Sequence, residues 1–242
     1  MKSYIKRFIL SLIIISSAIN IFAQEMQLSG GFEAGFGIFK VYKDFYYSSY
    51  PLSNGHINEN TQSSFFALGI SLSVRVFPDT DNFVSTGFIF RDRAIFMTNI
   101  KQTGTETFTL SDDHFVSIMD FDMGVSFRYK ILNGFQLYAD LGLNFTIMDS
   151  ENFKTSDTFN YLGFGIFTGV ALQLNLNKTL YLEFGVNSIN NIFSGQEGTY
   201  HMSNNIKVNY EDSGRWDLTS VAAYIHFGVR FDLKKIWNRS QR

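Results

Sequence analysis

The chain of 242 residues contains no cysteine, only two prolines and few charged side chains. Without cysteine it can form neither a disulfide framework nor a lipidated cysteine anchor. Asp, Glu, Lys and Arg make up 17% of the residues, against about 25% in an average soluble domain. No long unbroken apolar run follows the N-terminus, so a transmembrane helix is not the source of the 45% hydrophobic content.

The apolar residues are arranged in alternation instead, most clearly between Phe66 and Val76. Every second residue of this segment is large and apolar, and the residues between are small or polar. Because successive side chains of a strand point to opposite faces, one face is apolar and the other is not. The pattern recurs about eight times along the chain, which predicts an all-β, membrane-spanning, antiparallel β-barrel.

Eight strands are expected from this pattern. They are predicted at residues 26–39, 63–77, 82–97, 114–131, 135–148, 159–175, 179–188 and 216–233. Short connectors at 78–81, 132–134 and 176–178 alternate with long ones at 40–62, 98–113, 149–158 and 189–215. The alternation predicts an up-and-down barrel with short periplasmic turns, long outer loops and, since the strand number is even, periplasmic termini. Asn133-Gly134 is a favoured pair for a tight hairpin.

Residues 1–23 have the features of a secretory signal peptide, with Lys2, Lys6 and Arg7 before the apolar segment 8–15. Cleavage after Ala23 would leave 24–242 as one barrel domain, with the barrel at about 26–233 and a short tail at 234–242. Removing 1–23 takes away three of the 20 Lys and Arg and none of the 22 Asp and Glu, so the net charge changes from −2 to −5. That charge argues against a nucleic-acid partner.

The less apolar face of the strands is rich in small residues, which suits the narrow lumen of an eight-stranded barrel better than a water-facing exterior. Examples are Gly31, Gly35 and Gly37 in the first strand and Gly163, Gly165, Gly169 and Ala171 in the sixth. Aromatic residues gather where strands end, as in the interfacial girdles of membrane barrels. These are Phe77, Phe83, Tyr129, Phe135, Phe159, Trp216 and Phe231.

Alternation also assigns a set of charged residues to the lumen. They are Glu33, Arg75, Arg91, Arg93, Asp120, Asp122, Arg128, Lys130, Asp140, Glu183, Arg230 and Asp232. Six are acidic and six are basic, whereas a selective pore is more naturally lined by one sign of charge. The balance favours an ion-paired plug, and a gated or leaky channel is the alternative. Asp92 departs from the pattern, because alternation directs it to lipid; it could lie at the outer end of its strand or beside a bulge.

The last predicted strand resembles the terminal insertion signal of outer-membrane barrels, with His226, Gly228, Phe231 and Leu233 at the matching positions. The resemblance, over about 26–233, is to the class of small OmpA-, OmpX- and OmpW-like barrels. It implies a place in the bacterial outer membrane, outer-membrane lipid and the barrel-insertion machinery as partners, and no cofactor. The OmpA barrels also have an ion-paired interior. This chain departs from the signal by continuing to Arg242.

One short motif offers an enzymatic alternative. His201-Met202-Ser203-Asn204 resembles the His-x-Ser-Asn motif of PagL-type lipid A deacylases, which implies Ser203 as nucleophile, His201 as base and Glu211 or Asp212 as orienting acid. The other interpretation is a solvated loop, and no His, Asp and Glu spacing indicates a metal site.

The function expected from the sequence is therefore a non-enzymatic barrel that stabilises the envelope and exposes its outer loops. A small-solute pore or OmpW-like channel and a PagL-like lipid ester hydrolase are the alternatives. Aromatic residues in the loops would suit a surface ligand. They are Tyr42, Phe45, Tyr46, Tyr47, Tyr50 and Phe193.

Overall fold

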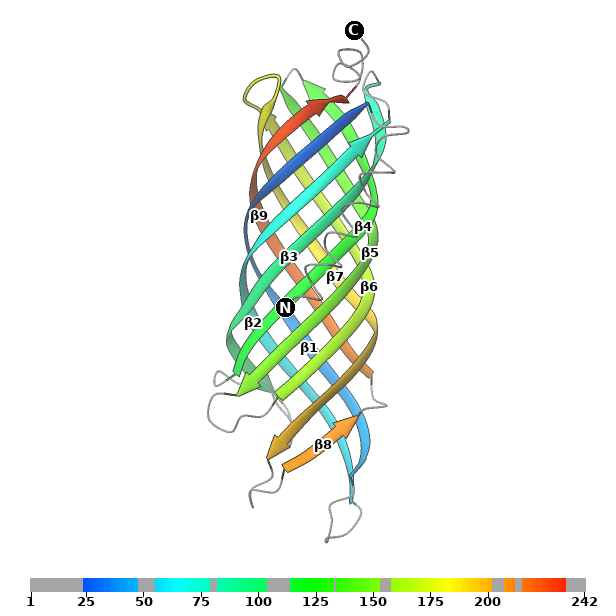
Figure 1. Ribbon diagram of the computed structural model, residues 1–242, viewed down its shortest axis with the longest axis vertical. Helices are drawn as coiled ribbons and strands as arrows, with labels where there is room; N and C mark the ends of the chain where they lie inside the picture. Colours follow the sequence, from blue (N-terminus) through cyan, green and yellow to red (C-terminus); the bar gives the residue numbers. More distant parts are fainter. Residues whose placement is uncertain are drawn as a thin grey trace.

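The computed structural model describes most of the predicted barrel (Figure 1). The described residues are 24–47, 55–78, 82–103, 114–132, 134–152, 158–201, 207–211 and 215–233. The predicted signal peptide 1–23 and the tail 234–242 lie outside them. Within the described ranges no helix is long and apolar enough to cross a membrane.

The strands form a closed, all-antiparallel barrel. They are β1 (Glu25–Tyr47), β2 (Gly55–Phe77), β3 (Val84–Thr103), β4 (His114–Leu132), β5 (Phe135–Asn152), β6 (Thr158–Asn175), β7 (Leu180–His201), β8 (Lys207–Glu211) and β9 (Arg215–Asp232). Strands β1 to β7 pair in chain order, and β9 pairs with both β7 and β1, which closes the sheet. The short β8 pairs only with β7. The prediction of an eight-stranded up-and-down barrel is confirmed.

The two ends of the barrel differ as the connector lengths predicted. The strand ends that flank the short connectors 78–83, 133–134 and 176–179 lie at one end, which we call the turn end, together with the start of β1 and the end of β9. Gly134 has a φ of 101°, the left-handed conformation that favours glycine in a tight hairpin. Predicted strand ends at the turn end agree with the structure to within about two residues.

At the opposite, loop end five of the eight predicted strands are too short, whereas β4, β6 and β9 begin within one residue of their predicted starts. β1 continues to Tyr47 instead of 39, β2 begins at Gly55 instead of 63, and β7 reaches His201 instead of 188. Backbone pairing carries on here without an outward apolar row; the ladder of β1 and β2, for example, ends at Tyr47 and Gly55. The alternation of apolar and polar residues indicates which strand positions face lipid, but it does not indicate backbone pairing. It therefore cannot predict where the extended strands end.

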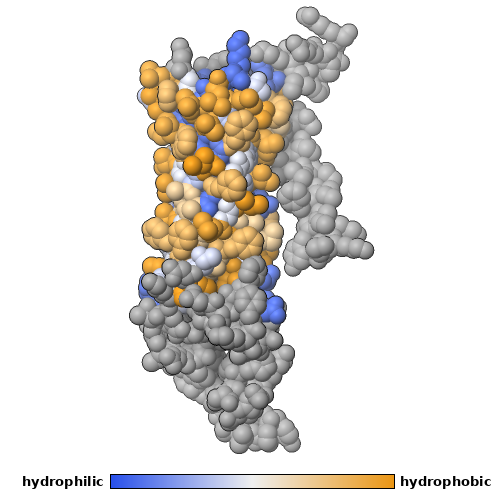
Figure 2. All heavy atoms as spheres, turned by 90° about the vertical axis from the view of Figure 1, so that its left-hand side faces the viewer, coloured by the Kyte–Doolittle hydropathy of each residue, from blue (hydrophilic) through white to orange (hydrophobic). Residues whose placement is uncertain are grey.

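The outside of the barrel carries a broad apolar surface (Figure 2). Side chains in the outward rows are large and exposed, including Phe32 at 77%, Phe88 at 59% and Ile70 at 57%. A contiguous apolar surface of this extent is costly in water, because each Å² of apolar area exposed costs about 25 cal/mol. The same surface is stable against hydrocarbon.

The inside of the barrel combines small and large residues. A side chain at Gly228 would collide with the ring of Tyr181, and one at Gly185 would collide with the ring of Tyr224. The predicted lumen glycines Gly35, Gly37, Gly163, Gly165 and Gly169 are buried. Glycine on the inner face therefore makes room for tyrosine from the next strand.

Candidate functional site: the charged lumen

The lumen holds most of the predicted charged residues. Nine of the twelve are buried: Glu33, Arg75, Arg91, Arg93, Asp120, Asp122, Arg128, Asp140 and Glu183. Arg230 is partly exposed, as is Lys130, while Asp232 is exposed where β9 ends. Strand positions divide the interior into four successive layers between the turn end and the loop end.

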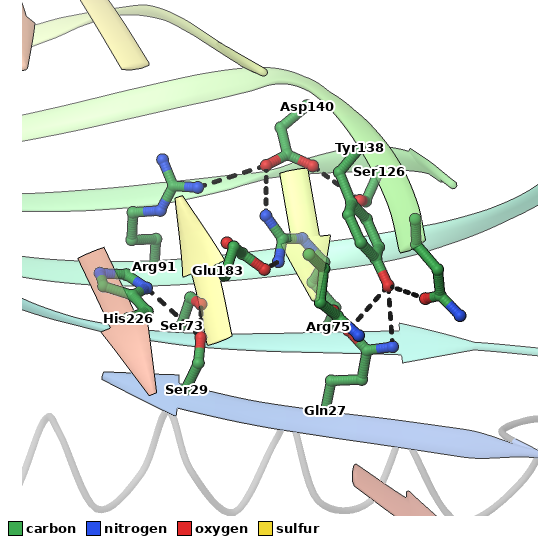
Figure 3. A network of polar contacts seen from close by, with 12 residues as sticks. Gln27, Ser29, Ser73, Arg75, Arg91, Ser126, Tyr138, Asp140, Glu183 and His226 are labelled. Carbon is green, nitrogen blue, oxygen red and sulfur yellow. Dashed lines mark hydrogen bonds and ion pairs between the residues drawn. The ribbon is translucent and has the colours of Figure 1, made fainter. Parts of the chain in front are cut away.

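The middle layer consists of Arg75, Arg91, Asp140 and Glu183 (Figure 3). Asp140 accepts hydrogen bonds from Arg75 at 2.8 Å and Arg91 at 3.2 Å, and from the Ser126 hydroxyl at 2.6 Å. Arg75 also donates to Glu183 at 2.5 Å. These residues come from β2, β3, β4, β5 and β7, so the network ties most of the barrel wall together.

The turn-end layer consists of Glu25, Arg128 and Arg230. Glu25 lies 2.6 Å from Arg128 and 3.3 Å from Arg230. The guanidinium of Arg128 covers the ring of Phe77 at 4.1 Å, a cation–π contact.

At the turn end one sequence prediction needs correction and one lumen residue was missed. Phe77 is fully buried in the lumen and is not part of an interfacial girdle, because it shares the inward row of Arg75. Glu25 was not predicted, since it precedes the expected strand by one residue. It shares an inward row with Glu33, so alternation extended by one residue would have found it.

The loop-side layer consists of Glu33, Arg93, Asp120 and Asp122. Arg93 lies 3.0 Å from Asp122, 3.6 Å from Asp120 and 3.9 Å from Glu33, so three carboxylates share one guanidinium. Polar neighbours complete the layer: Asn144 donates to Asp122 at 2.8 Å, Thr146 to Asp120 at 2.5 Å and Asn187 to Glu33 at 3.4 Å. In the described residues no group of three or more His, Asp and Glu is arranged to hold a metal ion.

An apolar layer fills the lumen between the loop-side layer and the loop end. It consists of Phe39, Phe65, Ala67, Ile95, Met97, Ile100, Val116, Ile118, Met148, Tyr161 and Leu218. A cavity of about 10 Å³ lies where this layer meets Asp120, which is space for about one water molecule. The sequence analysis missed the layer because it took charged and small residues as the lumen signal. Phe65, Ile95 and Met97 lie in the same inward rows as the charges.

His226, predicted as part of the insertion signal, lies inside the barrel. Its ring contacts Ser71 at 2.5 Å and Ser29 at 3.3 Å, and Ser29 contacts Ser73 at 2.7 Å. A serine and a histidine in contact can form a nucleophile and base pair, but these side chains are buried where a lipid ester cannot reach. Their arrangement is that of a packed polar cluster. Of the other signal residues, Gly228 faces the lumen, and Phe231 and Leu233 are partly exposed.

The residues of the hydrolase alternative are not brought together by the described backbone. His201 pairs with Lys207, whereas Glu211 pairs with Glu197. These pairs are offset by four positions along β7, which is about 13 Å along the ladder. Ser203 lies outside the described residues, as do the side chains of the predicted aromatic loop set.

Comparisons with known proteins find similarity at the level of structure. No family model and no curated protein sequence matches the chain. The outer membrane protein OprG from Pseudomonas aeruginosa matches with a TM-score of 0.54 at 11% identity, over 86% of this chain and 96% of OprG. Ail, the attachment invasion locus protein of Yersinia pestis, matches with a TM-score of 0.38 at 12% identity, over 84% and 98%. The outer membrane protease OmpT from Escherichia coli matches with a TM-score of 0.45 at 10% identity, over 86% and 96%. Taken with its closed eight-stranded barrel, the chain has the fold of the small bacterial outer-membrane β-barrels.

Proposed function

We propose that the chain is an integral outer-membrane protein with a sealed lumen, which stabilises the envelope and presents its loop-end segments at the cell surface. The apolar exterior and the fold shared with OprG support the location. The proposal also places the turn end and both termini in the periplasm, after removal of the signal peptide and insertion by the barrel machinery. The alternation of short turns and long connectors supports that orientation.

The filled lumen is the observation that carries the functional proposal. A hydrated ion crossing the barrel would have to part Arg75 from both Asp140 and Glu183, all of which are buried. Breaking a buried ion pair costs about 3–5 kcal/mol. The ion would then have to lose water to pass the apolar layer, and apolar constrictions close pores by dewetting. Charge layers and an apolar layer in series therefore oppose both ions and apolar solutes.

Conductance in planar bilayers tests this proposal. The purified protein is expected to give no steady single-channel openings, because buried ion pairs and the apolar layer occupy the lumen between the described strands. A variant with Phe65→Ala, Ile95→Ala and Arg75→Ala, which thins two layers, serves as the control that the assay detects an opened lumen. Steady openings of the unaltered protein would refute the sealed lumen and favour a small-solute pore.

A further inference from the structure

Asp92 is an acidic residue in the middle of the apolar exterior. On β3 it lies in the outward row between Phe90 and Ala94. Its Cα partners are Leu72 on β2 and Phe121 on β4, and both of these side chains are exposed on the outside. The residue thus interrupts a surface that is otherwise suited to hydrocarbon.

Neither explanation that the sequence allowed for Asp92 holds. The strand does not end near it, because β3 continues to Thr103. No bulge redirects it, because Arg91, Asp92 and Arg93 pair in unbroken register with both neighbouring strands. The irregularity between β2 and β3 lies at Ser64 and Phe66 instead.

Few polar groups lie near the carboxylate of Asp92. It lies against the backbone N–H of Arg93, whose side chain points into the lumen. Among the described residues Asp92 forms no ion pair. The other acidic and basic side chains in the outward rows, Lys40, Asp149, Glu151 and Asp217, lie towards the loop end. A lone ionisable group facing hydrocarbon costs several kcal/mol and marks a functional position.

We propose that Asp92 marks the face through which two copies of this chain associate side by side in the membrane, with the two Asp92 carboxyls hydrogen-bonded to each other. This rests on the membrane location in the proposed function. Both copies insert with the same end outward, so a two-fold axis between them runs parallel to the barrel axes. A residue that lies on this axis meets its own counterpart at the same depth.

The chemistry of a carboxyl group fits this symmetric contact. In the protonated form it carries one donor and one acceptor, so two such groups satisfy each other without a third residue. The described exterior offers no basic group at this depth, which makes the counterpart Asp92 the partner that a second copy supplies. Ala94, the next outward residue, is small and lets the two strands approach closely.

Cysteine cross-linking in lipid vesicles tests the proposal, since the chain has no cysteine of its own. Ala94→Cys is expected to give cross-linked dimers, whereas Ala223→Cys, an outward residue on β9, is expected to give none. Adding Asp92→Leu to Ala94→Cys should reduce dimers about tenfold, the effect of losing a hydrogen bond of 1–2 kcal/mol in the membrane. Adding Asp92→Asn should preserve them, because an amide both donates and accepts.

Equal cross-linking at positions 94 and 223, absence of dimers, or dimers unaffected by Asp92→Leu would overturn the proposal. A cross-link to a protein of another mass in native membranes, without dimers, would assign the face to a different partner and also overturn it. If Ala94→Cys does not fold, Phe90→Cys reports on the same row. Heat-dependent gel mobility shows that each variant forms the barrel, so failure to enter vesicles at all would instead count against the membrane location.

Discussion

At the scale of single residues, the lumen concentrates ion pairs whose partners come from distant parts of the chain. Asp140 receives two guanidiniums and a hydroxyl within 3.2 Å. Buried groups of this kind contribute little while complete, because desolvation offsets their attraction, but removing one member leaves the others uncompensated. Mutations here are therefore expected to cost far more than mutations of exposed charges.

Asp140→Asn should lower the free energy of unfolding by about 3–5 kcal/mol, since Arg75 would keep only Glu183 as a paired carboxylate and Arg91 would lose the carboxylate with which it pairs. Urea unfolding in lipid vesicles measures this change. Asp149→Asn, on an exposed side chain, is the matched control and should change stability by less than about 0.5 kcal/mol. Equal effects of the two substitutions would contradict the buried network.

Gly185→Val should lower the free energy of unfolding by about 1–3 kcal/mol, because the added side chain would displace the ring of Tyr224. The Tyr224 hydroxyl donates a hydrogen bond to Glu183 at 2.9 Å, so the middle layer would be disturbed as well. Ala139→Val, on the exposed exterior, is the control, and the same unfolding assay compares them. If Gly185→Val left the free energy of unfolding unchanged, the lumen would have space for the added side chain.

At the scale of elements, the barrel wall closes independently of the hairpin that β8 forms with the end of β7. β7 pairs with β9 only as far as Asn190 and Thr219, and beyond that its partner on this side is β8. β9 remains paired with β1 up to Tyr42 and Arg215. The closure of the barrel consequently does not depend on β8.

Replacing residues 200–211 by a short Gly-Ser turn, which keeps the pairing of β7 with β6 up to Thr199, should leave the urea midpoint within the error of the unaltered protein. The same deletion removes His201, Ser203 and Glu211, so it also tests the hydrolase alternative. Loss of a lipid A ester-releasing activity, together with its loss in Ser203→Ala, would establish that alternative. A large fall in stability would instead show that β8 supports the wall.

The sequence predicted these elements unevenly, for a physical reason. Where the strands cross the apolar outer surface, every second side chain points outward and is large. The eight strands and their limits at the turn end could therefore be predicted from alternation. Beyond this surface, β1 reaches Tyr47 and β7 reaches His201 through segments in which apolar and polar residues do not alternate. Their backbone pairing leaves no such trace in the sequence.

At the scale of the whole molecule, the apolar exterior gives opposite expectations for a membrane protein and a soluble barrel. Phe32→Arg, at a side chain 77% exposed, should lower the free energy of unfolding in bilayers by about 2–4 kcal/mol if this side faces hydrocarbon. In a water-facing barrel the same change would be neutral or would increase solubility. Unfolding in vesicles, with Asp149→Arg near the loop end as control, distinguishes the two.

The sequence by itself determined the barrel, its strand number, its two unlike ends and most of the charges that face inward, because all of these follow from the two-residue period of a strand. Only the tertiary structure decided how the charges combine, since Arg75, Asp140 and Glu183 meet across the lumen from three separate strands. The tertiary structure also revealed the apolar layer and showed that Asp92 lies in the middle of β3 on the outer face. Alternation fixes the side to which a residue points, whereas contacts depend on register and on closure of the barrel.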